Sequence, residues 1–245
     1  GYGATLAILS PFFLEALRRA GGMGVGVLSL PVYAAIVMSG HQSSAVLALI
    51  GLAGWAMLAL RNKEVGAKRQ VTGFVISAII GLLLGVYLSV VTGQVSTLAE
   101  APPRYQSFLY QSQLWELSWQ AFKDHWLTGV GMRGFGTFAL ATDASVIPGL
   151  AETWHSHLTI LEVISETGLV GLIGYGVLLR WLWGYVQDER IHVAVAGLTA
   201  LLAVFPLGTA VGMYSYIGGN LIFLTCTLLI ALDRDCPRVT ETSAP

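Results

Sequence analysis

The sequence predicts an all-α integral membrane protein with about seven transmembrane helices and one long extracytoplasmic loop that contains amphipathic helices. Of its 245 residues, 55% are hydrophobic and only 11% are charged, with a mean hydropathy of +0.69. Soluble domains carry roughly a quarter charged residues. The apolar runs show no strand-like alternation, and helices then remain the only reasonable spanning structure. The net charge of −1 gives no basis for binding nucleic acid, and two cysteines argue against a disulfide framework.

Seven apolar segments define the expected spans. They cover residues 1–17, 23–38, 43–60, 71–91, 168–183, 193–211 and 217–232. Several are shorter than the ~20 residues that a helix needs to cross the hydrocarbon core, but weakly polar flanks can extend them. The first segment begins without an initiator Met or a basic region before it, so we expect the chain to be the C-terminal part of a longer protein.

Lysine and arginine indicate the orientation. Four basic clusters flank the spans: Arg18 with Arg19; Arg61, Lys63, Lys68 and Arg69; Arg180 with Arg190; and Arg234 with Arg238. If all four are cytoplasmic, the seven spans alternate without conflict. The expected organisation is then four transmembrane helices in 1–91, an extracytoplasmic catalytic loop in 92–167, three transmembrane helices in 168–232 and a cytoplasmic tail in 233–245.

The loop contains a predicted amphipathic helix. Pro102 and Pro103 break any preceding helix and favour a new helix start. Five aromatic residues then fall close to one helical face: Phe108, Trp115, Trp119, Phe122 and Trp126. A Trp-rich amphipathic helix beside a membrane is typical of the lipid interface, where it serves as a structural lid or guides a lipid substrate.

A glycine-rich segment follows at residues 129–136, with the sequence GVGMRGFG. Its glycines allow tight turns, and free backbone N–H groups there could face an anion; a purely structural turn is the alternative. The segment lacks the Gly-Lys-Ser/Thr ending of a P-loop. It contains Arg133, which with Arg104 makes up the arginines of the outer side.

Histidines and carboxylates crowd together at the end of the loop. The sequence Glu152-Thr-Trp-His155-Ser-His157 lies just before a predicted span, at the height of the lipid headgroups. A histidine there can move protons near neutral pH. As an alternative, these histidines with Glu152 and Asp143 could hold zinc.

In order and spacing, these motifs resemble the large loop of the O-antigen ligase and polymerase superfamily. The matching positions are Trp115, Asp124-His125, Gly129-Val130-Gly131, His155-x-His157, Leu161-Glu162 and the segment 166–171, Glu-Thr-Gly-Leu-Val-Gly. A second family motif resembles residues 39–45. The chain departs from the family pattern where Leu158 replaces Asn, Trp126 replaces Pro, and Gln111 and Gln42 replace two arginines.

The resemblance implies transfer of a glycan from a polyprenyl-pyrophosphate carrier to a hydroxyl group of a lipid or polysaccharide, without a metal or other cofactor. It implies His157 as the general base, with His155 and Glu152 beside it. Arg104 and Arg133 would bind the pyrophosphate. His41, Gln42 and Glu162 would line the rest of the substrate site.

The expected location is the bacterial inner membrane, with the loop in the periplasm. Three alternatives remain open at this point: an O-antigen polymerase, a transporter, and a non-catalytic membrane partner. A transporter is disfavoured because no internal repeat is visible and the polar groups gather in one loop rather than at mid-membrane positions.

Overall fold

The structure is a computed structural model that describes residues 2–20, 23–39, 42–61, 67–91, 102–142, 156, 158–206 and 216–235. Side chains are not described for residues 23–25, 42–43, 102–111, 216–218 and 235. The elements are α1 (Tyr2–Ala20), η1 (Met23–Leu28), α2 (Ser29–Met38), α3 (Gln42–Arg61), α4 (Ala67–Val91), α5 (Pro102–Asp124), α6 (Phe135–Ala141), α7 (Thr159–Val186), α8 (Ile191–Ala203) and α9 (Tyr216–Asp235). The part of the chain described here contains no strand, which confirms the all-α prediction for it.

Three helices are long and apolar enough to cross a membrane by length and composition. They contain the windows Ser44–Arg61, Ala67–Val91 and Thr159–Val186. Two shorter apolar helices cover Gly26–Met38 and Ile191–Ala203. The complete arrangement of seven spans remains a prediction.

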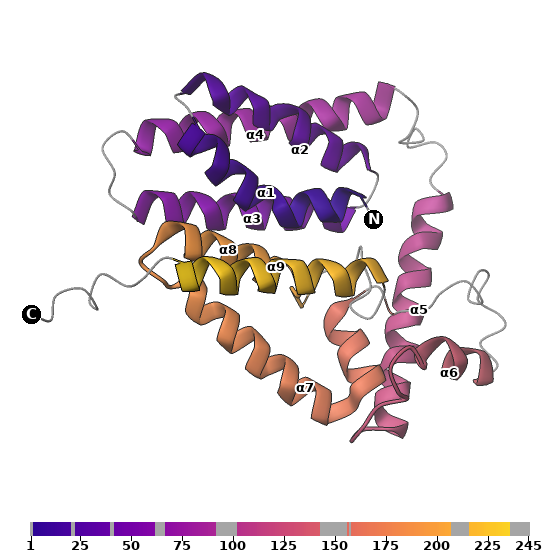
Figure 1. Cartoon of the computed structure of the whole chain (residues 1–245). Helices are drawn as coiled ribbons and strands as arrows, with labels where there is room; N and C mark the ends of the chain where they lie inside the picture. Colours follow the sequence, from indigo (N-terminus) through magenta and orange to yellow (C-terminus); the bar gives the residue numbers. More distant parts are fainter. Residues whose placement is uncertain are drawn as a thin grey trace, which may run out of the picture.

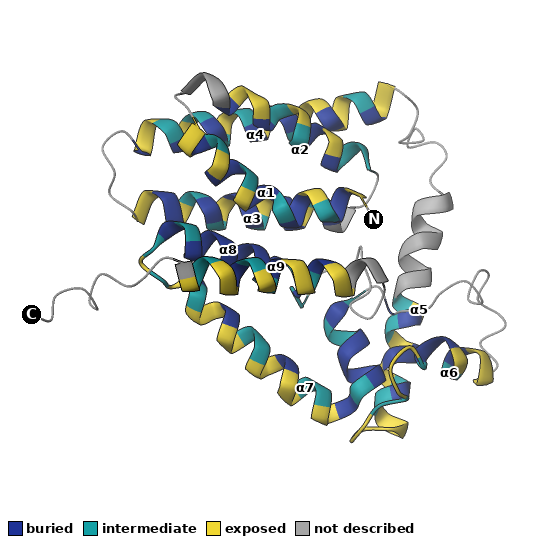
Figure 2. Cartoon of the chain, viewed as in Figure 1, coloured by how far each residue is buried: buried dark blue, intermediate teal, exposed yellow. Residues whose placement is uncertain are grey.

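Most helices lie side by side in a bundle, whereas α5 and α6 form a separate group at one end of it (Figure 1). Helix α8 is at the centre, where it packs against α1, α3, α7 and α9. It is buried along nearly its whole length (Figure 2). A helix that is apolar all round is stable only when other elements surround it, so its sequence suits this position.

Helices α2 and α4 cross at unusually short range. A Cβ atom at Gly81 would lie 2.5 Å from the carbonyl oxygen of Leu30, and one at Gly85 would lie 2.7 Å from that of Ala34. The two glycines are four residues apart, on one face of α4. Small residues at this spacing let membrane helices approach closely, where van der Waals contacts replace the missing hydrophobic driving force.

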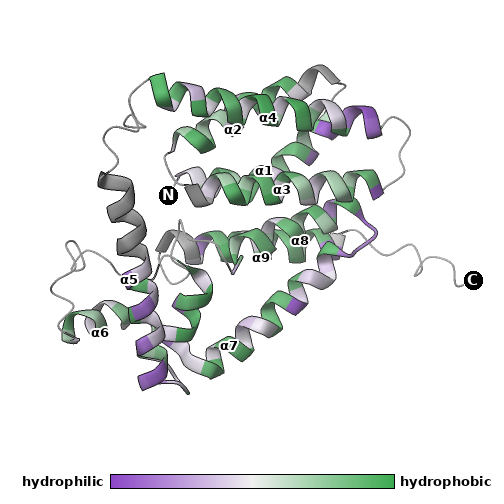
Figure 3. Ribbon diagram, turned by 180° about the vertical axis from the view of Figure 1, so that it is seen from behind, coloured by the Kyte–Doolittle hydropathy of each residue, from purple (hydrophilic) through white to green (hydrophobic). Residues whose placement is uncertain are grey.

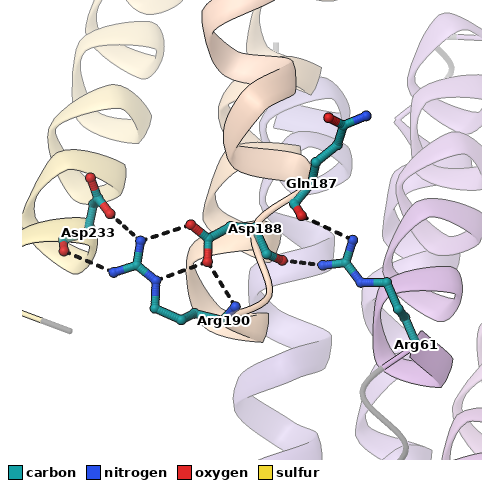
Figure 4. Close-up of polar contacts among 5 residues, drawn as sticks. All are labelled: Arg61, Gln187, Asp188, Arg190 and Asp233. Carbon is teal, nitrogen blue, oxygen red and sulfur yellow. Dashed lines mark hydrogen bonds and ion pairs between the residues drawn. The ribbon is translucent and has the colours of Figure 1, made fainter. Parts of the chain in front are cut away.

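The α7–α8 link lies at the opposite end of the bundle from α5 (Figure 1), and two arginines join the helix ends there (Figure 4). Arg190 donates to Asp188 Oδ1 and Oδ2, at 2.9 and 2.8 Å, and it also pairs with Asp233 in α9. Arg61, at the end of α3, donates to the carbonyl oxygens of Gln187 and Asp188. The hydrogen bonds from Arg190 to Asp188, and then to Asp233, raise the pKa of its guanidinium above the ordinary value.

These arginine contacts bring the predicted cytoplasmic clusters together. Arg19 of α1 lies 3.4 Å from the ring Nδ1 of His192, the second residue of α8. Residues from α1, α3, the α7–α8 link and α9 therefore meet at one end. Seen from behind, hydrophilic residues gather in the α7–α8 link at this end and along α5 at the other (Figure 3).

We expect Gly81→Ala to lower the free energy of unfolding by about 1–3 kcal/mol, because the new methyl group overlaps backbone atoms of α2 that cannot rotate away. The matched control is Gly73→Ala in the same helix, where a Cβ meets nothing within 4 Å. Since alanine is the better helix former, the control should be neutral or stabilising by up to about 1 kcal/mol. Unfolding of both variants in detergent micelles measures this difference, and equal stability would contradict the close crossing.

Candidate functional site

The candidate site is built on a break in α7. At Gly168 the backbone adopts φ 62° and ψ −154°, which interrupts the helix between Thr159 and Val186. In an unbroken helix, the N–H groups of Leu169 and Val170 would donate to the carbonyl oxygens of Ser165 and Glu166, four residues earlier. The break separates these donors from these acceptors, so all four groups need other partners.

The turn between α5 and α6 supplies every one of those partners. Ser165 and Glu166 accept hydrogen bonds from the N–H groups of Val130 and Gly131, at 2.9 and 3.0 Å. On the other side of the break, Leu169 donates to the carbonyl oxygen of Trp126 at 2.8 Å, and Val170 donates to that of Leu127 at 3.2 Å. The turn and the broken helix therefore satisfy one another's backbone groups through four hydrogen bonds. We call this set of four hydrogen bonds the exchange.

Two glycines make this approach possible. Gly129 has φ 68°, and a Cβ there would lie 2.3 Å from the backbone carbon of Glu166. At Gly168, a Cβ would lie 2.6 Å from the backbone nitrogen of Gly129. Both positions thus combine a left-handed φ with backbone contact, and only glycine meets both conditions without strain.

Arg133 occupies an unusual backbone position in the same turn. Its φ is 60°, and it is the one non-glycine residue with a positive φ among the described residues. Its backbone N–H donates to Glu166 Oε2 at 2.7 Å, and the following Gly134 donates to the carbonyl oxygen of Gly131. The Arg133 residue itself is exposed, and the described part of the chain gives its guanidinium no ion-pair partner. An exposed cationic residue is therefore held on a fixed backbone, and its charge also acts on the buried Glu166 carboxylate.

The first part of α7 carries the acidic side of the site. Glu162, Ser165 and Glu166 are all buried, and Glu166 is only 1% exposed. Besides the N–H of Arg133, the backbone N–H of Phe135 also faces the Glu166 carboxylate. The loop N–H groups expected to face an anion thus face groups of the protein itself, carbonyl oxygens and one carboxylate.

Helix α5 begins at Pro102, as expected from the two prolines. The rings of Trp119 and Phe122 lie 5.3 Å apart on it, and the position of its aromatic face at a lipid interface stays a prediction. The buried residues are Leu114, Leu117, Ser118 and Ala121, and two of them pack against Phe135 and Ala139 of α6. Trp119 and Trp126 are 50% and 55% exposed. Small and aliphatic residues fit the contact with α6, and Trp119 and Trp126 remain exposed.

The exposed aromatic residues continue into the apolar surface of α7. Trp126 and Leu127 are joined to Leu169 and Val170 by the backbone hydrogen bonds of the exchange, and all four residues are exposed. An apolar surface of this kind on a candidate membrane span fits contact with lipid, and tryptophan is favoured where lipid meets water.

Among the predicted site residues, the structure describes the side chains of Arg133 and Glu162. Arg104 lies in the first turn of α5 and Gln42 is the first residue of α3, but neither side chain is described. The remaining predicted residues lie outside the described residues: His41, Glu152, His155 and His157.

Two further observations concern this segment. Ser156, between the two histidines, is buried, and its hydroxyl donates to the carbonyl oxygen of Leu158 at 3.0 Å. The described residues contain no group of three or more His, Cys, Asp or Glu side chains that could hold a metal ion. The alternative zinc ligands, including Asp143, are outside this part of the chain.

The sequence prediction missed the contact between Glu166 and Arg133. Glu166 lies at the mouth of a predicted span, where an ionisable group is costly unless it is solvated or paired, and the sequence indicates no partner for it. The two residues are 33 positions apart, so helical periodicity carries no sign of their contact. The glycine motifs around Gly129 and Gly168 were the available signal in the sequence. Each glycine is followed by two residues whose backbone N–H groups donate hydrogen bonds of the exchange.

Comparison with known families assigns the chain. Residues 25–176, more than half of the sequence, match the family described as O-antigen ligase. The chain belongs to the O-antigen ligase family. Neither the curated proteins nor the solved structures contain a match. Membership in the O-antigen ligase family confirms the resemblance and indicates glycosyl transfer at a membrane, of the ligase or polymerase kind. It implies lipid-linked glycans and lipid or polysaccharide molecules as substrates.

We expect Gly168→Ala to destabilise the protein by at least about 2 kcal/mol, because alanine is strained at this φ and ψ and its methyl group meets the backbone at Leu127 and Gly129. Gly174→Ala, further along α7, is the matched control, since nothing lies within 4 Å of a Cβ there. Thermal unfolding in detergent measures both. A Gly168→Ala variant as stable as the control would show that the exchange is absent.

Proposed function

We propose that this protein is a membrane glycosyltransferase that moves a glycan from a polyprenyl-pyrophosphate carrier to a hydroxyl group of a lipid or polysaccharide acceptor. The observation that carries the proposal is the exposed guanidinium of Arg133, held on a turn fixed to the broken α7 within the family match. The donor is a dianionic or more highly charged lipid, and it requires cationic or N–H donors at headgroup height.

Arg133 and Arg104 are proposed to bind the pyrophosphate. As the bond to the sugar breaks, the leaving pyrophosphate takes the electron pair and its negative charge grows. A cation directed at that charge stabilises the transition state more than the ground state. Arginine suits this task because its planar guanidinium forms two parallel hydrogen bonds to phosphate oxygens.

His157 is proposed as the general base. It takes the proton from the acceptor hydroxyl as that oxygen bonds to the anomeric carbon, and such assistance contributes roughly 10²–10⁴ in rate. His155 and Glu152 are proposed to orient or assist it. The start of α7 at Thr159 and the buried Ser156 support this assignment, because they tie the segment to the same helix that receives the Arg133 turn.

Three further residues are proposed to complete the substrate site. Glu162 lies in the first turn of α7, on the same side of the break as Glu166, and a carboxylate there can accept hydrogen bonds from sugar hydroxyls. His41 and Gln42 precede or begin α3 and are proposed to line the opposite wall. Gln42 takes the place of an arginine in the family pattern, so it would bind through neutral hydrogen bonds.

The proposed location is the bacterial inner membrane, with the arginine-joined end of the bundle in the cytoplasm. Positive charge on the cytoplasmic side supports this orientation. The α5–α6 group lies at the opposite end of the bundle and would therefore face the periplasm (Figure 1). No metal or other cofactor is part of the proposed mechanism.

We expect His157→Ala to reduce glycan transfer by about 10²-fold or more while leaving donor binding intact, because only proton removal is lost. The assay uses the protein in detergent with EDTA, a polyprenyl-pyrophosphate glycan and a panel of lipid and polysaccharide acceptors. His192→Gln, a histidine substitution at the arginine-joined end, serves as the control and should retain transfer.

The outcomes separate the alternatives. Transfer to a lipid acceptor identifies a ligase, and chain extension of a polysaccharide identifies a polymerase. Equal transfer by wild type and His157→Ala would remove this histidine from the mechanism. An absence of transfer by the wild type to every acceptor would favour a transporter or a non-catalytic partner.

A further inference from the structure

Glu166 and Arg133 form a contact in addition to the backbone hydrogen bonds that attach the turn to α7. The turn is already attached to α7 by four backbone hydrogen bonds, through residues on both sides of Gly168. The hydrogen bond from the Arg133 N–H to Glu166 Oε2 is additional, and it lies beyond the exchange, four residues after Gly129. It acts on the residue whose backbone is strained.

Both residues are costly choices for a purely structural turn. An L-residue other than glycine, asparagine or aspartate is disfavoured in the left-handed region, and the neighbouring positions with positive φ, 129 and 131, are both glycine. A carboxylate that is 1% exposed is likewise costly unless hydrogen-bonded. Strained backbone of this kind is found where a side chain must be held for function.

We propose that Glu166 is a positioning residue: by accepting the backbone N–H of Arg133, it holds this arginine in the left-handed conformation that directs the guanidinium outward to a lipid pyrophosphate. The inference rests on the proposed function, because that function supplies the ligand. Glu166 itself does not contact the ligand. Its carboxylate lies beneath the turn, on α7, and Arg133 lies above it with an exposed side chain.

The hydrogen bond, not the charge, carries this role. A carboxylate near the site repels an anionic ligand, and Glu162 adds a second negative charge close by. Glu166→Gln keeps an acceptor oxygen and removes that repulsion. Glu166→Ala removes the acceptor and leaves the N–H groups of both Arg133 and Phe135 without it. The two variants therefore separate positioning from electrostatics.

The experiment measures binding of farnesyl pyrophosphate to the full chain in detergent, for wild type, Glu166→Ala, Glu166→Gln, Arg133→Ala and the Glu166→Ala/Arg133→Ala double variant. We expect Glu166→Ala to weaken binding about tenfold and Glu166→Gln to stay within about twofold of wild type. Arg133→Ala should weaken binding by tenfold or more, and the double variant should match it, since Glu166 acts through Arg133.

Hydrogen exchange at the Arg133 amide gives a second readout. It should be fast in Glu166→Ala and slow in both wild type and Glu166→Gln, because only the alanine variant lacks the acceptor. Additive losses in the double variant, equal weakening by Gln and Ala, or unchanged binding in Glu166→Ala would each overturn the proposal. Absence of pyrophosphate binding by the wild type would also overturn it.

The inference and the proposed function can fail separately. If the wild type binds farnesyl pyrophosphate with the expected pattern across the variants but transfers no glycan to any acceptor, the positioning role stands and the transferase proposal falls. If the wild type transfers glycan and Glu166→Ala does so with an unchanged KM for the donor, the transferase proposal stands and the positioning role falls.

Discussion

The exchange of backbone hydrogen bonds between the α5–α6 turn and the broken α7 is the interaction on which the rest of the candidate site depends. A break in a candidate membrane span leaves donors and acceptors that lipid cannot satisfy, and each unsatisfied group costs several kcal/mol in hydrocarbon. Here two N–H groups and two carbonyl oxygens of α7 find matched partners in one short turn. The helix can therefore be broken only because the turn is present, and the turn is held only because the helix is broken.

This mutual dependence explains how the site is positioned. The exchange holds Gly129 against Gly168, and the chain then continues into Arg133 with its outward guanidinium. It also holds the first part of α7, which carries Glu162 and Glu166 and begins two residues after His157. The turn that carries the proposed cationic group and the first part of α7 are thus held by the same backbone hydrogen bonds. Pre-organisation of this kind stabilises developing charge without reorganisation during the reaction.

The sequence predicted the helices well where hydrophobicity decides them. Long apolar runs indicated both ends of α3 to within one residue and the end of α4 at Val91, although α4 begins at Ala67 rather than at residue 71, and Pro102 indicated the start of α5. The prediction was less accurate where tertiary contacts decide. The span expected from residue 168 is part of a helix that begins at Thr159, because the backbone groups at its break are satisfied by a turn about 40 residues earlier in the chain. The residues that α5 buries could not be read from its own periodicity, because they depend on its packing against α6 and α7. His41, Glu152, His155 and His157 lie outside the described residues, so their roles rest on the family pattern alone.

The central claim is that a lipid pyrophosphate binds at the joint between the turn and the broken helix. Photo-crosslinking tests it most directly: a photoactivatable polyprenyl pyrophosphate is bound to the full chain in lipid vesicles, irradiated, and its adducts are located by mass spectrometry. The account predicts adducts in peptides that contain residues 129–135 and 152–162, which competing unlabelled polyprenyl pyrophosphate suppresses. Adducts confined to α1, α4 or the arginine-joined end of the bundle would contradict it.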